Sequence, residues 1–185
     1  MGFGENFGAV LPACRLGAEW AWREVYEDLA PDVLRYFRAR RAHEPEDLLG
    51  ETFLQIVRSL PSFEGGERDF RAWVFTIART RLIDQERRRA RRPAHPVPPE
   101  DLVRLGAVGD AEQDALRSLA EQRVRLVLET LTPDQRDVLL LRILADLTVE
   151  QVARVLGKRP GAVKVLQARG VEAFRRAMAK GAVTI

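Results

Sequence analysis

Residues that build covalent or metal-bound frameworks are scarce in this sequence. Of its 185 residues, one is a cysteine, Cys14, and two are histidines, His43 and His95. A single cysteine excludes an internal disulfide, and one thiol with two imidazoles supplies too few ligands for a standard zinc cluster. We therefore expect a fold without disulfides, metal ions or other cofactors.

Long apolar runs are also absent. The longest, such as Val138–Leu141, span only a few residues, whereas a helix needs roughly 20 apolar residues to cross a bilayer. The first residues, Met1–Asn6, lack the basic start, apolar stretch and small-residue cleavage site of a secretion signal. These absences exclude a membrane span and predict a cytoplasmic protein.

Charge, in contrast, is abundant and unevenly placed. Charged residues make up 31% of the chain and hydrophobic residues 46%, a composition typical of one or two small soluble domains. The net charge of +3 conceals an acidic stretch at 43–60 and two basic stretches at 79–92 and 154–180. Separated basic stretches favour a polyanionic partner such as nucleic acid. A solvated arginine-rich surface is the alternative.

Apolar residues recur with helical spacing, and no alternating run indicates a strand, so we predict an all-α fold. One helix is expected near 20–29, another from Pro31 onward, and a third over about 45–60. Paired glycines predict a loop at 63–69, before a long helix that ends in an arginine cluster. The third helix is expected to turn these residues inward: Leu48, Leu49, Phe53, Ile56, Val57 and Leu60.

A proline-rich segment divides the chain. Prolines between Pro93 and Pro99 lack the N–H donor and push the preceding residues into extended conformations, so no helix continues there. We predict a first domain at 9–92, an extended acidic linker at 93–111 and a second domain at 112–180.

The second domain has well-marked helix starts. Thr132 and Thr148 each precede a glutamine three residues later, which is the capping-box spacing. Gly157 can adopt the left-handed conformation that ends a helix, and Pro160 opens the next one. A short helix, a glycine turn and a basic second helix predict a helix-turn-helix, which lays its second helix in the DNA major groove.

The last helix divides into two faces. Val163, Leu166, Gly170, Val171 and Phe174 would pack inward, whereas Lys164, Val165, Ala168 and Arg169 would face away. Small or apolar side chains can approach thymine methyl groups, and cations can reach guanine edges or phosphates. This pattern favours DNA binding, and a helical hairpin with a solvated basic face is the alternative.

Two sets of motifs, one at Pro45–Phe53 and Phe70–Asp84 and the other between Leu131 and Lys164, resemble one known family over nearly the whole chain. That family is the extracytoplasmic-function (ECF) class of bacterial sigma factors. Pro45–Phe53 resembles the family's region 2.2, and Phe70–Asp84 resembles regions 2.3 and 2.4. The motifs that resemble region 4 are Leu131–Arg136, Val138–Arg142, Val152–Ala153, Leu156–Gly157 and Gly161–Lys164. The resemblance implies two small helical domains joined without a folded region 3.

The same resemblance implies a function without catalysis: a subunit that directs RNA polymerase to promoters. Its partners would be promoter DNA and the core polymerase, through the β′ coiled coil and β flap, with an anti-sigma factor as a further candidate. The residues implied for polymerase binding are Glu46, Asp47, Leu49, Gly50 and Glu51, with Leu49 exposed beside the acids.

DNA contacts are implied in both domains. The residues implied for recognising and melting the minus-10 element are Phe63, Glu64, Arg68, Asp69, Arg79, Thr80, Arg81, Arg87 and Arg88. The residues implied for reading the minus-35 element as duplex are Lys158, Arg159, Ala162, Lys164, Val165, Ala168 and Arg169. Trp73 could stack on a base, but its place in the apolar stripe favours a core role.

Several positions depart from the family pattern. Gly50 stands where glutamine is usual, Thr80 replaces a common asparagine, and Arg159 sits where serine often caps the recognition helix. Gln167 lies where leucine is frequent. These departures leave the expected fold intact and leave base-level specificity open.

Two other functions compete with this interpretation. A stand-alone helix-turn-helix regulator would bind duplex DNA without polymerase, but it leaves the first domain unexplained. A metal-dependent phosphoesterase could use Glu46, Asp47 and Glu51, since Asp47 and Glu51 lie one helical turn apart. No histidine or further carboxylate is placed to complete such a site.

Overall fold

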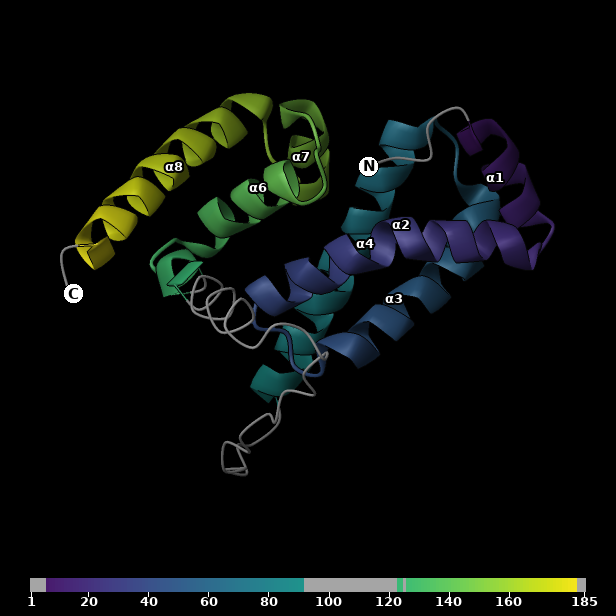
Figure 1. Ribbon diagram of the computed structural model, residues 1–185, viewed down its shortest axis with the longest axis horizontal. Coiled ribbons are helices and arrows are strands. Elements are labelled where there is room, and N and C mark those ends of the chain that lie inside the picture. The colour runs from purple at the N-terminus through teal and green to yellow at the C-terminus, as the bar shows by residue number, and fades with distance from the viewer. Residues whose placement is uncertain (1–5, 92–122, 125, 183–185) are drawn as a thin grey trace, which may run out of the picture.

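The computed structural model describes residues 6–91, 123–124 and 126–182, which are helical with short connections (Figure 1). No strand occurs among these residues, so the all-α prediction is confirmed. The helices of the first domain are α1 (Phe7–Arg15), α2 (Glu19–Ala39), α3 (Pro45–Ser59), the 3-10 turn Leu60–Ser62, and α4 (Glu67–Arg91). Those of the second domain are α6 (Pro133–Ile143), α7 (Val149–Leu156) and α8 (Pro160–Ala182). The predicted linker at 93–111 and the start of the second domain lie outside the described residues.

Helices α2, α3 and α4 enclose an aromatic and aliphatic core in the first domain. Its largest members, which are fully or almost fully buried, include Tyr36, Phe37, Ile56, Phe70 and Phe75. The ring of Phe75 meets that of Tyr36 edge-on, with ring centres 5.9 Å apart. This packing determines which faces of α3 and α4 remain exposed to solvent.

The first domain differs from the prediction at two helices. Pro31 lies inside a continuous α2 instead of opening a separate helix. A proline costs an interior helix about 3 kcal/mol because it lacks the N–H donor. Leu29 and Val33, on either side of it, are completely buried, and this shared burial holds the helix together. Helix α1 was not predicted; its residues Val10 and Leu11 pack on the same core.

The helix starts of the second domain follow the prediction. Thr132 and Thr148 both form complete capping boxes, with Gln135 and Gln151 as their partners. Gly157 ends α7 with a φ of 62°, in the left-handed region that favours glycine. Helices α6, α7 and α8 therefore form the predicted helix-turn-helix unit.

The two domains are in contact. Helix α7 packs against α4, and α6 packs against α2. Figure 1 shows α8 on the side of the second domain that faces away from α2, α3 and α4. Helix α8 is therefore accessible, whereas part of α4 is covered.

Candidate nucleic-acid and polymerase interfaces

The outer face of α8 carries the side chains expected to contact DNA. Val163 is completely buried and Gly170 is buried, so the inward side of the helix is held by the domain core. Leu166, Val171 and Phe174 are partly buried against the same core, as predicted. The residues that remain exposed are Ala162, Lys164, Val165, Ala168 and Arg169.

The turn before α8 places two further cations. The Lys158 backbone N–H donates to the Ala153 carbonyl at 2.9 Å, which closes the end of α7. The Lys158 side chain is half-buried and pairs with Asp134 at 2.8 Å. Arg159 is exposed just before Pro160. Lys158 therefore has a structural partner, whereas Arg159 faces solvent.

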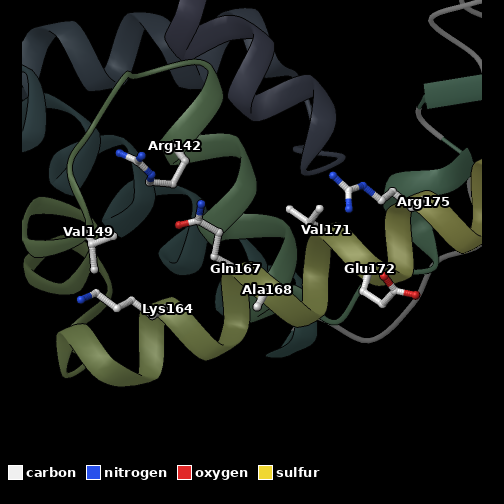
Figure 2. Close-up of a pocket in the computed structure, with 8 residues that line it drawn as sticks. All are labelled: Arg142, Val149, Lys164, Gln167, Ala168, Val171, Glu172 and Arg175. Carbon is white, nitrogen blue, oxygen red and sulfur yellow. The ribbon is translucent and has the colours of Figure 1, made fainter.

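A shallow hollow runs along one side of α8 (Figure 2). It is lined by Arg142, Val149, Lys164, Gln167, Ala168, Val171, Glu172 and Arg175. Three cations against one acid make this flank favourable for anions such as DNA phosphates. Neither Arg142 nor Arg175 was among the predicted minus-35 residues, although Arg175 belongs to the basic stretch at 154–180. Arg142 lies at the end of α6 and donates to the Leu147 carbonyl, so only the folded turn brings it beside α8.

The loop expected at the minus-10 element is anchored by its first residue. The Phe63 ring is 5% exposed and packs on Phe70 and Trp73, with ring centres 5.3 Å and 5.1 Å apart. Trp73 is partly buried against the core, which agrees with its expected core role. Gly65 has a φ of 142°, and a Cβ there would come within 3.0 Å of the Asp69 Cβ. The backbone conformation therefore requires glycine at 65.

Exposure in this loop differs from residue to residue. The loop is shorter than the predicted 63–69, because Arg68 and Asp69 lie in the first turn of α4, which begins at Glu67. Glu64 of the loop and Arg68 are exposed, and Asp69 is paired with Arg154 at 2.8 Å. Phe63 was expected to contact DNA, but its side chain is part of the core. The candidates for DNA contact in the loop and the first turn of α4 are therefore the polar residues Glu64, Arg68 and Asp69.

The cations of α4 point in several directions. Arg79 donates to Asp137 of the second domain at 3.3 Å, and Arg81 donates to Gln55 at 2.6 Å. Thr80 is exposed, and its hydroxyl donates to the Thr76 carbonyl. Arg87 and Arg88 are exposed near the end of the helix. The predicted minus-10 residues thus divide into an exposed group, a group that the second domain engages, and two residues, Phe63 and Arg81, whose partners lie within the first domain.

The acidic face of α3 is exposed, with one correction. Glu46, Asp47, Gly50 and Glu51 lie outside, but Leu49 is 5% exposed and belongs to the core, so it is not available for polymerase binding in this structure. The Arg38 guanidinium, 2.6 Å from Glu46, lowers the pKa of that carboxyl. Asp47 and Glu51 lie on one stripe of the helix surface because they are one turn apart.

Apolar side chains on this surface come from other positions. Leu54 is 58% exposed and Val57 is 46% exposed, although Val57 was expected inward. Leu54 follows Glu51 by three residues, so it extends the acidic stripe. The outer face of α3 therefore combines carboxylates with an apolar edge.

A metal-dependent phosphoesterase would use Glu46, Asp47 and Glu51 of α3. Within the described residues, no group of three or more histidine, cysteine or carboxylate side chains could hold a metal ion. Across the same part of the chain, no helix is both long and apolar enough to traverse a bilayer.

Known proteins resemble both domains. The family model of Sigma-70 region 2 matches residues 25–92, and that of Sigma-70, region 4 matches residues 121–174. The chain is 32% identical to the ECF RNA polymerase sigma factor SigD of Mycobacterium tuberculosis over 180 residues, covering 93% of this chain and 84% of SigD. The chain therefore belongs to the ECF sigma factors, the alternative subunits that direct RNA polymerase to promoters.

Solved structures share the fold at lower identity. CnrH, in complex with the cytosolic domain of CnrY, is 18% identical with a TM-score of 0.67, over 95% of this chain and 99% of that chain. RpoE of Bartonella quintana, in complex with the anti-sigma factor NepR, is 22% identical with a TM-score of 0.59, over 96% of both chains. Both likenesses support the two-domain helical architecture.

Proposed function

We propose that α8 of this sigma factor reads the minus-35 element as duplex DNA. The observation that carries this assignment is the exposed face of α8, where Lys164, Val165, Ala168 and Arg169 lie opposite the buried Val163 and Gly170. The inward residues fix the helix, so its outer side chains can enter a major groove together. Arg142 and Arg175 supply further positive charge on one flank, suited to the DNA backbone.

The first domain acts on separating strands. The exposed Glu64 and Arg68, with Asp69 and the cations of α4, recognise the minus-10 element and stabilise its unpaired form. Extruding a base costs a few kcal/mol of stacking, which contacts to the loop and to the arginine-rich helix must offset. The sequence predicts no helix-turn-helix in this domain, and the cationic helix suits a single-stranded backbone.

The outer face of α3 binds the core polymerase. Asp47 and Glu51 supply carboxylates for a basic partner surface, and Leu54 and Val57 supply apolar area next to them. An interface with an apolar centre and a charged rim matches the usual anatomy of protein–protein contacts. A stand-alone regulator would not need this face.

Reversal of charge on α3 tests the proposal. The double variant Asp47→Lys with Glu51→Lys should lose holoenzyme assembly while its helicity is retained, because both positions are exposed and make no core contact. Glu150→Lys, an exposed acid on α7, is the matched control and should assemble normally. Binding of the double variant to core polymerase at the level of the control would reject the assignment.

The minus-10 role needs a different assay. Arg68→Ala should reduce permanganate reactivity of thymines on a duplex promoter, and a fragment already melted across the minus-10 element should restore transcription. Lys164→Ala should gain little from the melted fragment, since its contact lies in the duplex. Normal opening and unchanged minus-10 preference in Arg68→Ala would contradict the proposed role of the loop.

Three further features complete the proposal. The factor acts by binding alone, with no catalytic step of its own, and works where the polymerase is, in the cytoplasm. RpoE of Bartonella quintana binds the anti-sigma factor NepR, and its shared fold supports an anti-sigma factor as a candidate partner here.

A further inference from the structure

Helix α1 is fixed to the rest of the first domain by burial and by a side-chain hydrogen bond. Val10, Leu11 and Cys14 are buried, so one face of this short helix belongs to the core. The indole N–H of Trp22, on α2, donates to the Cys14 carbonyl at 3.1 Å. The end of α1 therefore has a defined position, and so does the backbone of Arg15, its last residue.

From this position the Arg15 side chain reaches the loop proposed for the minus-10 element, residues 63–66. Its guanidinium donates to the Phe63 carbonyl at 2.5 Å, although the two residues are 48 positions apart in the sequence. The Phe63 N–H donates to the Leu60 carbonyl at 3.0 Å, and the Phe63 ring packs on Phe70. The amide, the ring and the carbonyl of Phe63 are all held, and Arg15 is the side chain that holds the carbonyl.

Helix α1 also contacts the other end of the loop. The Phe7 ring lies 5.7 Å from the Phe70 ring, centre to centre, and the Phe70 N–H donates to the Gly66 carbonyl at 2.9 Å. Only residues 64–66 lie between Phe63 and the start of α4. Because one residue spans about 3.8 Å, so short a segment follows any displacement of its ends. The conformation of the loop therefore depends on contacts that α1 makes.

We propose that Arg15 is a positioning residue for minus-10 recognition, which acts through the Phe63 carbonyl. The inference rests on the proposed role of the loop and of the first turn of α4. A held carbonyl fixes the orientation of the peptide bond from which the exposed Glu64 begins. Gly65, at a φ of 142°, then continues in a conformation that favours glycine. Groups that are fixed before a base arrives discriminate between bases at a lower entropic cost than groups that must be ordered on binding.

Amide exchange tests whether Arg15 holds the loop. Arg15→Met keeps the length of the side chain and removes the donor, whereas Arg15→Lys keeps both a donor and the charge. Arg23→Met, which removes an exposed cation from α2, is the matched control. Exchange at the Phe63 amide, followed by NMR on the full chain, should be at least tenfold faster in Arg15→Met and close to wild type in the other two variants.

Exchange at the Val10 amide should be unchanged in all three variants, because the buried face of α1 is intact. An unchanged rate at Phe63 in Arg15→Met would overturn the proposal. An equal acceleration at Val10 and Phe63 would assign Arg15 to the folding of α1 alone and would also overturn it.

Base preference tests the functional consequence. Holoenzyme is titrated with a single-stranded oligonucleotide that contains the minus-10 element of a promoter it transcribes, and with variants that differ at one base. In wild type the least favoured variant should bind at least tenfold more weakly than the original element. Arg15→Met should reduce this ratio at least threefold, whereas Arg15→Lys and Arg23→Met should retain it. Binding of duplex minus-35 DNA should be the same in every variant, since α8 is unaltered.

A direct contact between Arg15 and a DNA phosphate would give a different result. Arg15→Met would then bind all the oligonucleotides more weakly by the same factor and with a smaller salt dependence, and its base preference would be unchanged. That result would overturn the positioning role.

The positioning role and the proposed function can fail separately. If Glu64→Ala and Arg68→Ala lose base preference while Arg15→Met retains it, the positioning role fails and the function of the loop stands. If Glu64→Ala and Arg68→Ala both keep wild-type preference, the proposed function of the loop fails and the positioning role fails with it. Exchange at the Phe63 amide still shows in that case whether Arg15 holds the carbonyl.

Discussion

Burial controls the chemistry of the single thiol. Cys14 is 4% exposed, and removal from water raises its pKa from 9.0 to about 11, with a smaller contribution from the negative charge of Glu24. The neutral thiol is the form that the folded protein favours. Its contribution to stability is therefore present below pH 9 and is lost as the pH rises from about 9 to about 11.

Alkylation kinetics should reveal this shift. At pH 8 a thiol of pKa 11 holds about 100-fold less thiolate than one of pKa 9, and burial slows access further. Cys14 should react with iodoacetamide at least 100-fold more slowly than the exposed thiol in Ala9→Cys, and unfolding in urea should remove the difference. Equal rates for the two thiols in the folded protein would contradict the described environment of Cys14.

Side-chain direction on α3 shows the limit of a sequence pattern. Periodicity placed both Leu49 and Val57 in an inward stripe. Leu49 is buried as that pattern predicts, but Val57 is 46% exposed. The exposure of Leu49 implied by the family resemblance is therefore wrong. Periodicity locates an apolar stripe on a helix, and the neighbouring helices determine which edge of the stripe is covered.

At the scale of the element, α3 has a residue with low helix propensity on its exposed face. Gly50 lies mid-helix, and no other part of the molecule lies within 4 Å of a Cβ added there. Gly50→Ala should raise the free energy of unfolding by about 0.5–1 kcal/mol, because glycine loses more backbone entropy than alanine on entering a helix. Chemical denaturation measures the change, and loss of stability would show that the position is not open.

The same position offers a functional comparison. Gly50→Gln introduces the residue that is usual in the family and should stabilise α3 while adding a polar group to the proposed polymerase surface. Affinity for core polymerase should therefore rise for Gly50→Gln by more than for Gly50→Ala. Equal affinities of the two variants would show that position 50 lies outside the interface.

Helix α8 permits a test that separates base contacts from phosphate contacts. Replacing Lys164 or Arg169 with alanine should cost about 1–3 kcal/mol of promoter affinity if the side chain reads a base. If the side chain touches only phosphate, its replacement should instead reduce the slope of log affinity against log salt concentration by about one unit. Arg23→Ala, which removes a cation from α2, should change neither quantity. Full affinity and an unchanged salt slope in both α8 variants would exclude this helix as the reader.

Helix boundaries were predictable where the signal is local. The starts of α6 and α7 follow from Thr132, Thr148 and their glutamine partners, because a cap is satisfied within four residues. Continuity of α2 through Pro31 was not predictable, since burial of Leu29 and Val33 depends on helices distant in sequence. Helix α1 was missed because it is nine residues long and no side chain caps its start.

At the scale of the whole molecule, the contact between domains was hidden from the sequence. Asp137 lies 101 residues from Tyr36 and 58 from Arg79, and no local pattern relates such positions. Burial raises the pKa of Asp137, and the charges of Arg40 and Arg79 act in the opposite direction. The sequence showed two basic stretches, and only the fold shows that one of them is partly engaged by the other domain.

Promoter-directed transcription from genomic DNA fragments tests the central claim most directly. The chain should be combined with core RNA polymerase that lacks any other sigma factor, and run-off transcription should be measured on genomic fragments. We predict discrete transcripts from a small set of fragments, lost with Asp47→Lys and Glu51→Lys and retained with Glu150→Lys. If the chain binds core polymerase and no discrete transcripts appear, as in the reaction without the chain, its assignment as a promoter-directing subunit would be contradicted.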